Sequence, residues 1–246
     1  MVAATVPLAG VFPQFGTQHL AILATCAAGG LLALWLGHRL RGRPADRVVR
    51  RSLAVVLAAF ALPLQLWQLT SKGWDFYTSL PLQLTDLDWM VAVWALWTLG
   101  WRSRSLLYYW GLTLTPQAIV TPELSFLWPH PAFIGFWGVH LFTFWSAVYL
   151  CLGAGFGPGW RSYRWTVLCT SVWAVLVMGF NAVAGTNSGF LNRKPTTSSL
   201  LDLFGPWPVY VVAEVAVVLT GWALLTWPWV ATAHRHRSAG DVRVGR

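Results

Sequence analysis

The chain has 246 residues, of which 56% are apolar and only 10% are charged, against about 25% charged residues in an average soluble domain. This composition excludes a disordered chain, which is polar and rich in charge, and three cysteines are too few for a disulfide scaffold. It also argues against a soluble globule, because too little polar surface exists to cover one. The remaining class is a multi-pass membrane protein, and the net charge of +9 then needs its own explanation.

Seven apolar runs of about 20 residues, the length that crosses a hydrocarbon core as a helix, follow one another along the chain. They cover approximately residues 18–37, 53–69, 79–99, 105–120, 131–153, 165–183 and 207–229. The loops between them are short and leave no room for a soluble domain. The pattern therefore predicts an all-α membrane protein, a seven-transmembrane-helix bundle that forms a single polytopic domain over 1–246, with a basic cytoplasmic tail at 230–246.

The basic residues follow the same pattern. Fourteen of the 17 Lys and Arg residues fall in the loops after the first, third and fifth runs and in the tail, and three fall on the opposite side. Cytoplasmic loops are rich in Lys and Arg, so this bias predicts an N-terminus outside and a C-terminus inside the cytoplasmic membrane. The positive charge thus sets topology and contacts anionic lipid headgroups, and no nucleic-acid partner is expected.

Polar residues inside the runs gather in the outer half of the predicted membrane. Thr85 lies about six residues below the start of the third run, roughly 9 Å down, and Asp88 shares its helix face. His140 in the fifth run lies roughly 13 Å down, and Glu214 in the seventh roughly 10 Å, with Tyr210 one turn above it. Ionisable groups at membrane depth are costly, so this layer predicts a polar pocket that opens toward the extracytoplasmic side.

Further polar side chains belong to the same layer and are candidates for substrate binding. They are Gln83, Gln117, Asn181, Asn187, Lys194 and Tyr210. Asp86 points to a neighbouring face of the third run, whereas Gln65 and Gln68 share a face of the second run and are typical of hydrogen bonds between helices. The sequence has no metal-binding cluster and no nucleotide-binding loop, so it implies no metal and no cofactor.

Thr85 and His140 at these depths are suited to nucleophilic catalysis on an ester. His140 as general base would take the proton of the Thr85 hydroxyl, which then attacks an ester carbonyl. Asp88 or Glu214 would orient the imidazole and stabilise its cation. The oxyanion donors would be the amides of Gln83, Asn181 or Asn187. The depths fit the ester carbonyls of glycerolipids, just below the headgroups, where scarce water favours acyl transfer over hydrolysis.

Two interpretations without catalysis stay open. In a transporter or a small-ligand-binding protein, buried Asp86, Asp88, His140 and Glu214 would form a proton or cation path, which for transport must continue through both leaflets. A structural membrane protein with a satisfied polar core predicts instead that Thr85 lies far from His140.

Five stretches, residues 12–20, 80–87, 109–124, 187–195 and 199–210, together with His140, carry a resemblance that covers most of the chain. Through them the chain resembles the YwaF-type bacterial integral membrane proteins, which are related to the eukaryotic transmembrane acyltransferase of ether phospholipids. The resemblance implies a seven-segment bundle, acyl transfer, and phospholipids or lysophospholipids as partners.

The chain departs from that family at two motifs. The family has His-Leu-Cys, with the cysteine as expected nucleophile, where residues 83–85 read Gln-Leu-Thr. It has Asn-Tyr-Met where residues 187–189 read Asn-Ser-Gly. A Thr–His pair is similar to that of the androgen-induced type of membrane lipid hydrolase, so the resemblance leaves an acyltransferase and a lipid esterase both open.

Overall fold

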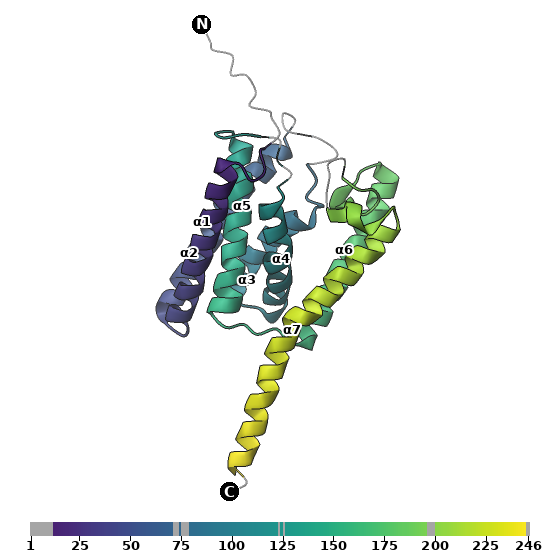
Figure 1. Cartoon of the computed structure of the whole chain (residues 1–246). Coiled ribbons are helices and arrows are strands. Elements are labelled where there is room, and N and C mark those ends of the chain that lie inside the picture. The colour runs from purple at the N-terminus through teal and green to yellow at the C-terminus, as the bar shows by residue number, and fades with distance from the viewer. Residues whose placement is uncertain are drawn as a thin grey trace. The chain divides into compact units, whose positions relative to one another are not determined.

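The computed structural model describes residues 12–70, 74, 79–122, 124, 126–195 and 200–244, and at residues 200 and 233–244 it describes the backbone alone. Over this part of the chain the fold is all-helical, with seven α-helices, a π-helical segment, two short 3-10 helices and no strand (Figure 1). The elements are α1 Thr17–Leu40, α2 Pro44–Gln68, α3 Leu84–Thr98, α4 Trp101–Val120, α5 Pro131–Ala147, the π-helical η1 Val148–Gly153, α6 Trp160–Ala184, the 3-10 helices η2 Ser188–Phe190 and η3 Leu200–Phe204, and α7 Val209–Val244.

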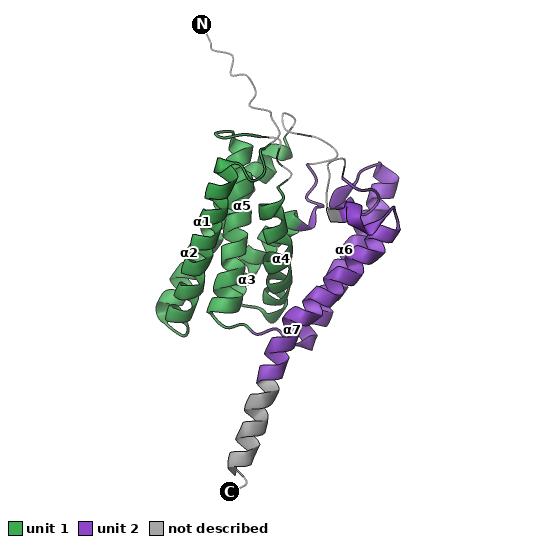
Figure 2. Cartoon of the chain, viewed as in Figure 1, with its two compact units in different colours: residues 1–75, 85–156 green, residues 76–84, 157–246 purple. Residues whose placement is uncertain are grey.

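The helices belong to two compact units, each described here by itself (Figure 2). Unit 1 comprises residues 1–75 and 85–156, and therefore holds α1, α2, α4, α5, η1 and nearly all of α3. Unit 2 comprises residues 76–84 and 157–246, and holds α6, α7, η2 and η3. The organisation as one domain stays a prediction.

Five helical stretches are long and apolar enough to cross a membrane. They are α1, α2, α5 continued by η1, α6, and the part of α7 that spans Val209–Thr232. The prediction of a multi-pass, all-helical membrane protein is thus confirmed. Of the remaining described helices, α3 has only 15 residues and α4 carries Arg102 and Arg104 in its first turn.

Several helix boundaries differ from those predicted. α2 begins at Pro44, nine residues before the predicted start, because proline is favoured in the first helical turn, where its missing N–H is not needed. α7 continues to Val244, so the predicted tail is helical over most of its length. α6 begins at Trp160 instead of residue 165.

The start of α3 is the boundary that matters for the site. The third run was predicted from residue 79, but residues 79–83 form bends and α3 begins at Leu84. Leu80 precedes a proline, which disfavours its helical conformation. Within unit 2, Trp173 Nε1 donates to the Leu82 carbonyl at 3.0 Å, and the Gly189 N–H donates to Gln83 Oε1 at 2.7 Å. These contacts hold the segment before α3 outside the helix.

In unit 1, α1 and η1 approach each other closely at two glycines. A Cβ atom added to Gly37 would lie 2.6 Å from Gly153 Cα and 2.6 Å from the Tyr149 carbonyl oxygen. Arg41 reinforces this contact, because its guanidinium donates to the Gly153 carbonyl at 2.7 Å. Small residues at such crossings let membrane helices pack backbone against backbone.

Replacing Gly37 with alanine should lower the stability of the protein by about 1–3 kcal/mol, because the new methyl group meets backbone atoms that cannot rotate away. The matched control is Gly179→Ala in α6, since nothing lies within 4 Å of a Cβ at that position. Thermal unfolding of the detergent-purified variants measures the effect. Equal melting temperatures for both variants would contradict the close approach.

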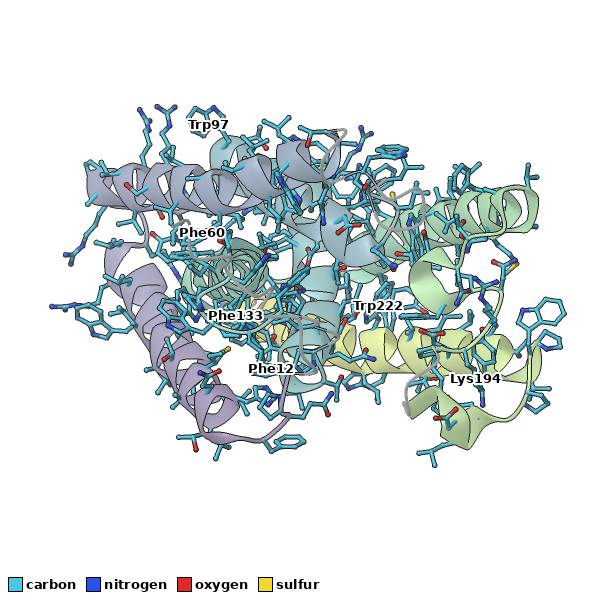
Figure 3. All side chains as sticks on the ribbon, turned by 90° about the horizontal axis from the view of Figure 1, so that it is seen from above. Phe12, Phe60, Trp97, Phe133, Lys194 and Trp222 are labelled. Carbon is cyan, nitrogen blue, oxygen red and sulfur yellow. The ribbon has the colours of Figure 1, made fainter. Side chains whose placement is uncertain are left out.

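An aromatic cluster ties together one end of unit 1. Phe12 and Phe133 lie close to each other there (Figure 3), with ring centroids 5.8 Å apart, and Trp137 lies 5.6 Å from Phe12. His19 is fully buried beside them, and its Nε2–H donates to the Ile119 carbonyl at 2.8 Å, because its Nδ1 accepts from the Phe15 N–H. The cluster therefore links the first turn of α1, the last turn of α4 and the first half of α5.

Candidate functional site

A cavity of about 200 Å³ lies at the same end of unit 1. Its walls come from the last turns of α2, the first turns of α3, the first half of α5, and Leu124 and Phe126 between α4 and α5. Its polar lining residues are Gln65, Gln68, Thr85, Asp86 and His140, and the rest of the lining is apolar or aromatic. Thr85 and His140, which the sequence separates by 55 positions, thus line one cavity.

His140 is held in a defined orientation by the backbone of its own helix. Its Nδ1 lies 2.7 Å from the Phe136 carbonyl oxygen, and its ring packs on the Phe136 ring with centroids 4.1 Å apart. A carbonyl oxygen can only accept, so Nδ1 carries the proton. In the neutral imidazole, Nε2 then keeps its lone pair, as a general base requires.

Thr85 lies in the first turn of α3, not about six residues below the start of the helix as predicted. Among the described residues its side chain has no hydrogen-bond partner. The first four N–H groups of an α-helix lack partners inside the helix, and this end carries the positive end of the helix dipole. A threonine hydroxyl, backbone donors and a positive helix end therefore adjoin one cavity.

The acidic residue beside Thr85 in the cavity is Asp86, not Asp88 as predicted. Thr85, Asp86 and Trp89 all line the cavity. At about 100° per residue these three positions form one continuous face of the helix, whereas Asp88 lies beyond Thr85, about 160° around the helix from Asp86. Asp88 is 1% exposed, and its Oδ2 accepts a hydrogen bond from Thr115 Oγ1 at 2.6 Å.

Asp88 therefore does not orient the imidazole in this structure. The Phe136 carbonyl occupies the position that the Ser-His-Asp arrangement gives to a carboxylate. Gln117, predicted to bind substrate, is exposed on α4 and does not line the cavity. The cavity is thus lined by Thr85 and His140, and its other polar lining residues are Gln65, Gln68 and Asp86.

The other predicted residues lie in unit 2, where Asn181 is the centre of a loop network. Asn181 Nδ2 donates to the Ser188 carbonyl and to Asn192 Oδ1, and its Oδ1 accepts from Thr186 Oγ1 and from the Ser188 N–H, all within 3.0 Å. An amide has two donors and two lone pairs, so its capacity is filled. Asn181 is 2% exposed, and its amide has no donor left for an oxyanion.

Replacing Asn181 with leucine should destabilise the protein, by about 1–3 kcal/mol for each buried partner left unpaired. The exposed Thr220→Ala in α7 is the control. Urea or thermal unfolding in detergent gives the difference in stability. If Asn181→Leu unfolds like the parent but loses activity, the amide acts on substrate and the structural assignment is wrong.

The remaining predicted residues of unit 2 also contact its loops. Asn187 Oδ1 accepts from the Arg193 N–H at 3.1 Å. Lys194 forms an ion pair with Asp202 at 3.5 Å and lies 5.8 Å from the Tyr210 ring centroid. The Tyr210 hydroxyl donates to the Phe190 carbonyl. Glu214, the last of these predicted residues, is half-buried on α7 one turn after Tyr210.

A second polar cluster of unit 1, at the opposite ends of its helices, was not singled out from the sequence. Asp46 in the first turn of α2 accepts from Arg50 Nε at 2.8 Å and from the Tyr149 hydroxyl at 2.7 Å. Arg50 also donates to the Leu96 carbonyl at 2.6 Å and is 7% exposed. The i, i+4 spacing of Asp46 and Arg50 was a signal for the ion pair, but nothing local indicates their burial.

Two findings come from comparison with known proteins. The model of a family described as the TMEM164 family matches residues 14–226. The matched range contains all the residues that line the cavity and all helices except the last part of α7. No curated protein and no solved structure matches the chain.

Proposed function

The chain belongs to the TMEM164 family and has helices of membrane-spanning length and apolarity, and from this premise we propose that it is an integral membrane lipid acyltransferase, or the corresponding lipid esterase. Thr85 is the nucleophile and His140 the general base. The observation that carries the proposal is that both residues line one cavity while the Phe136 carbonyl leaves the His140 Nε2 lone pair free.

The proposed reaction has two half-reactions. In the first, His140 Nε2 takes the proton of Thr85 Oγ1 as the oxygen attacks the ester carbonyl of a phospholipid, and the resulting oxyanion faces the N–H groups at the start of α3. The bond to the glycerol oxygen then breaks, and the imidazolium protonates the departing lysophospholipid. In the second, the hydroxyl of another lysophospholipid, or water, loses its proton to His140 as its oxygen attacks the acyl-Thr85 ester. The bond between the acyl group and Thr85 Oγ1 then breaks, and the imidazolium returns the proton to Thr85 Oγ1.

A lipid ester fits the position of the cavity. It adjoins three helix ends, and His140 lies nine residues, roughly 13 Å, from the start of α5. Ester carbonyls of a bilayer lie at the border of its hydrocarbon core. The resemblance to relatives of an ether-phospholipid acyltransferase favours the same substrate class.

The proposal includes a topology. α3 and α4 join the five longer stretches as spans, the N-terminus lies outside, and the C-terminus lies in the cytoplasm. The distribution of Lys and Arg supports this orientation. The cavity then lies in the outer half of the cytoplasmic membrane.

The one-sided position of the cavity favours an enzyme over a transporter. Its lining residues all come from the ends of α2, α3 and α5 that lie together, with Leu124 and Phe126 beside them. Alternating access needs a substrate path through both leaflets, with the site near the midplane.

Trapping the acyl-enzyme tests the proposal. The purified protein is incubated with phosphatidylcholine without a lysophospholipid acceptor, denatured quickly, and measured by intact mass spectrometry and peptide mapping. We expect a mass increase of one acyl group on the peptide that contains Thr85, and its loss in Thr85→Ala. An acyl group on a different residue contradicts the assignment of the nucleophile, and acyl transfer without a covalent intermediate contradicts the mechanism.

A further inference from the structure

A second hollow lies beside the Thr85–His140 cavity in unit 1. It has a volume of about 520 Å³ and lies between α2 and α5. Leu64, Trp67 and Ala132 line both spaces, so the two share a wall. The proposed function makes no use of this hollow, which we call the α2–α5 groove.

The walls of the groove are formed mainly by large side chains on α2 and by Pro131, Ala132, Ile134 and Gly135 at the start of α5. Phe60, Pro63, Leu64 and Trp67 have the spacing i, i+3, i+4, i+7 and therefore share one face of α2. On α5, a Cβ added to Gly135 would lie 2.9 Å from Leu64 Cδ2. Leu64 therefore packs directly on Gly135, which lets the two helices approach each other at the wall of the groove.

One end of the groove is closed by aromatic rings, and its side is open. Phe60 lies between α2 and α5 (Figure 3) and stacks on Phe142, with ring centroids 5.5 Å apart. The Phe60 ring also covers Gly138, whose added Cβ would lie 2.3 Å from it. Along the groove, Trp67 is 47% and Ile134 38% exposed, so the groove opens on the outer surface of unit 1.

We propose that the α2–α5 groove binds one acyl chain of the lipid whose ester lies in the Thr85–His140 cavity, and that Phe60 limits the length of this chain; the proposal rests on the proposed function. The two spaces are adjacent, because three residues line both of them, and the lining of the groove is apolar except for His130. Both helices have the length and apolarity of membrane spans, so in a bilayer the open side of the groove faces acyl chains.

The position of the groove favours an acyl chain as its occupant. Phe60 and Trp67 are seven residues apart on α2, so the groove extends roughly 10 Å along the helix. It lies directly beside the Thr85–His140 cavity, with Leu64, Trp67 and Ala132 common to both. An acyl chain whose ester occupies the cavity is therefore already next to the groove.

Photolabelling tests the binding site without any need for turnover. The protein is placed in nanodiscs with a phosphatidylcholine that carries a diazirine on one acyl chain, irradiated, and mapped by mass spectrometry. Labelling of the peptides that line the groove is compared with labelling around Leu31 and Leu32, which are exposed on α1. We expect Ala59→Trp, whose new side chain fills the groove, to lower the ratio of groove labelling to α1 labelling about tenfold. Leu62→Trp is the matched control, because Leu62 is exposed on α2 and lines neither space.

Each result decides the proposal. Equal labelling of the groove and of α1, or an equal effect of the two tryptophan variants, shows only general lipid contact and overturns it. Cross-links between two copies through the groove overturn it as well. Thr85→Ala should label like the parent, since Thr85 does not line the groove. Selective labelling in a protein that transfers no acyl group would reject the catalytic function and keep the lipid site.

A second variant tests the role of Phe60. Phe60→Ala removes the ring that closes the groove, and the parent and variant are offered an equimolar mixture of phosphatidylcholines with 12 to 20 acyl carbons per chain. We expect the preferred acyl chain among the products to become longer. Val55→Ala, at an exposed position on α2 that does not line the groove, is the control. An unchanged chain-length profile overturns the role of Phe60.

Discussion

Replacing His140 with alanine is expected to lower acyl transfer by about 10²- to 10⁴-fold, the contribution typical of a positioned general base. The residue has a defined tautomer through the Phe136 carbonyl and lines the cavity with Thr85. Vesicles reconstituted with phosphatidylcholine and a labelled lysophospholipid give the rate. His38→Ala is the matched control, because His38 is exposed near the end of α1.

Thr85→Ala should cause a loss of similar size, and the double variant should be little worse than either single variant, since a nucleophile and its base act as one unit. Thr85→Ser should keep part of the activity, because it retains a hydroxyl in the same position. Thr25→Ala, on the exposed face of α1, is the control for the threonine. Additive losses in the double variant, or full activity in either single variant, would contradict the proposed pair.

Replacing Asp46 with alanine is expected to destabilise the protein by about 3 kcal/mol or more, because it leaves the buried Arg50 without its ion-pair partner. Asp46 is the common acceptor of Arg50 and of the Tyr149 hydroxyl, and Arg50 also binds the Leu96 carbonyl. Asp46 thus joins α2 to η1, and its ion-pair partner Arg50 joins α2 to α3.

Thermal unfolding in detergent measures the effect, with Arg47→Ala as the control for an exposed charge on the same turn of α2. Tyr149→Phe should cost less, about 1 kcal/mol, because it removes one hydrogen bond without leaving a buried charge. Equal stability of Asp46→Ala and Arg47→Ala would contradict the buried network.

Short-range sequence patterns identified some residues of the candidate site but not the way in which they are arranged. Thr85 and His140 were identified as candidates because polar groups at membrane depth stand out in an apolar run. The choice between Asp86 and Asp88 depended on which face of α3 packs toward α2 and α5. The depth of Thr85 in its helix depended on where α3 begins, and that boundary depends on contacts from Trp173 and Gly189 in unit 2. These contacts join residues 91 and 106 positions apart along the chain, so no short window of sequence contains both partners.

The fold also decides which hydrogen-bond partners the predicted oxyanion donors have. Asn181, Asn187 and Gln83 have the chemistry of oxyanion donors, and sequence reasoning assigned them that role. In the structure, the Asn181 amide already makes its hydrogen bonds to loop residues, and Gln83 Oε1 accepts a hydrogen bond from the Gly189 N–H. A residue type indicates what a side chain can bind, whereas the fold decides whether that capacity is already used.

The sequence by itself determined that this protein is helical and crosses a membrane several times, because apolar runs and their length act within one segment of about 20 residues. Only the tertiary structure decided that Thr85 and His140 line one cavity, that the Phe136 carbonyl orients the imidazole, and that α2 and α5 leave an apolar groove beside them. Those features depend on which helix faces meet, and that depends on packing between residues far apart in the chain.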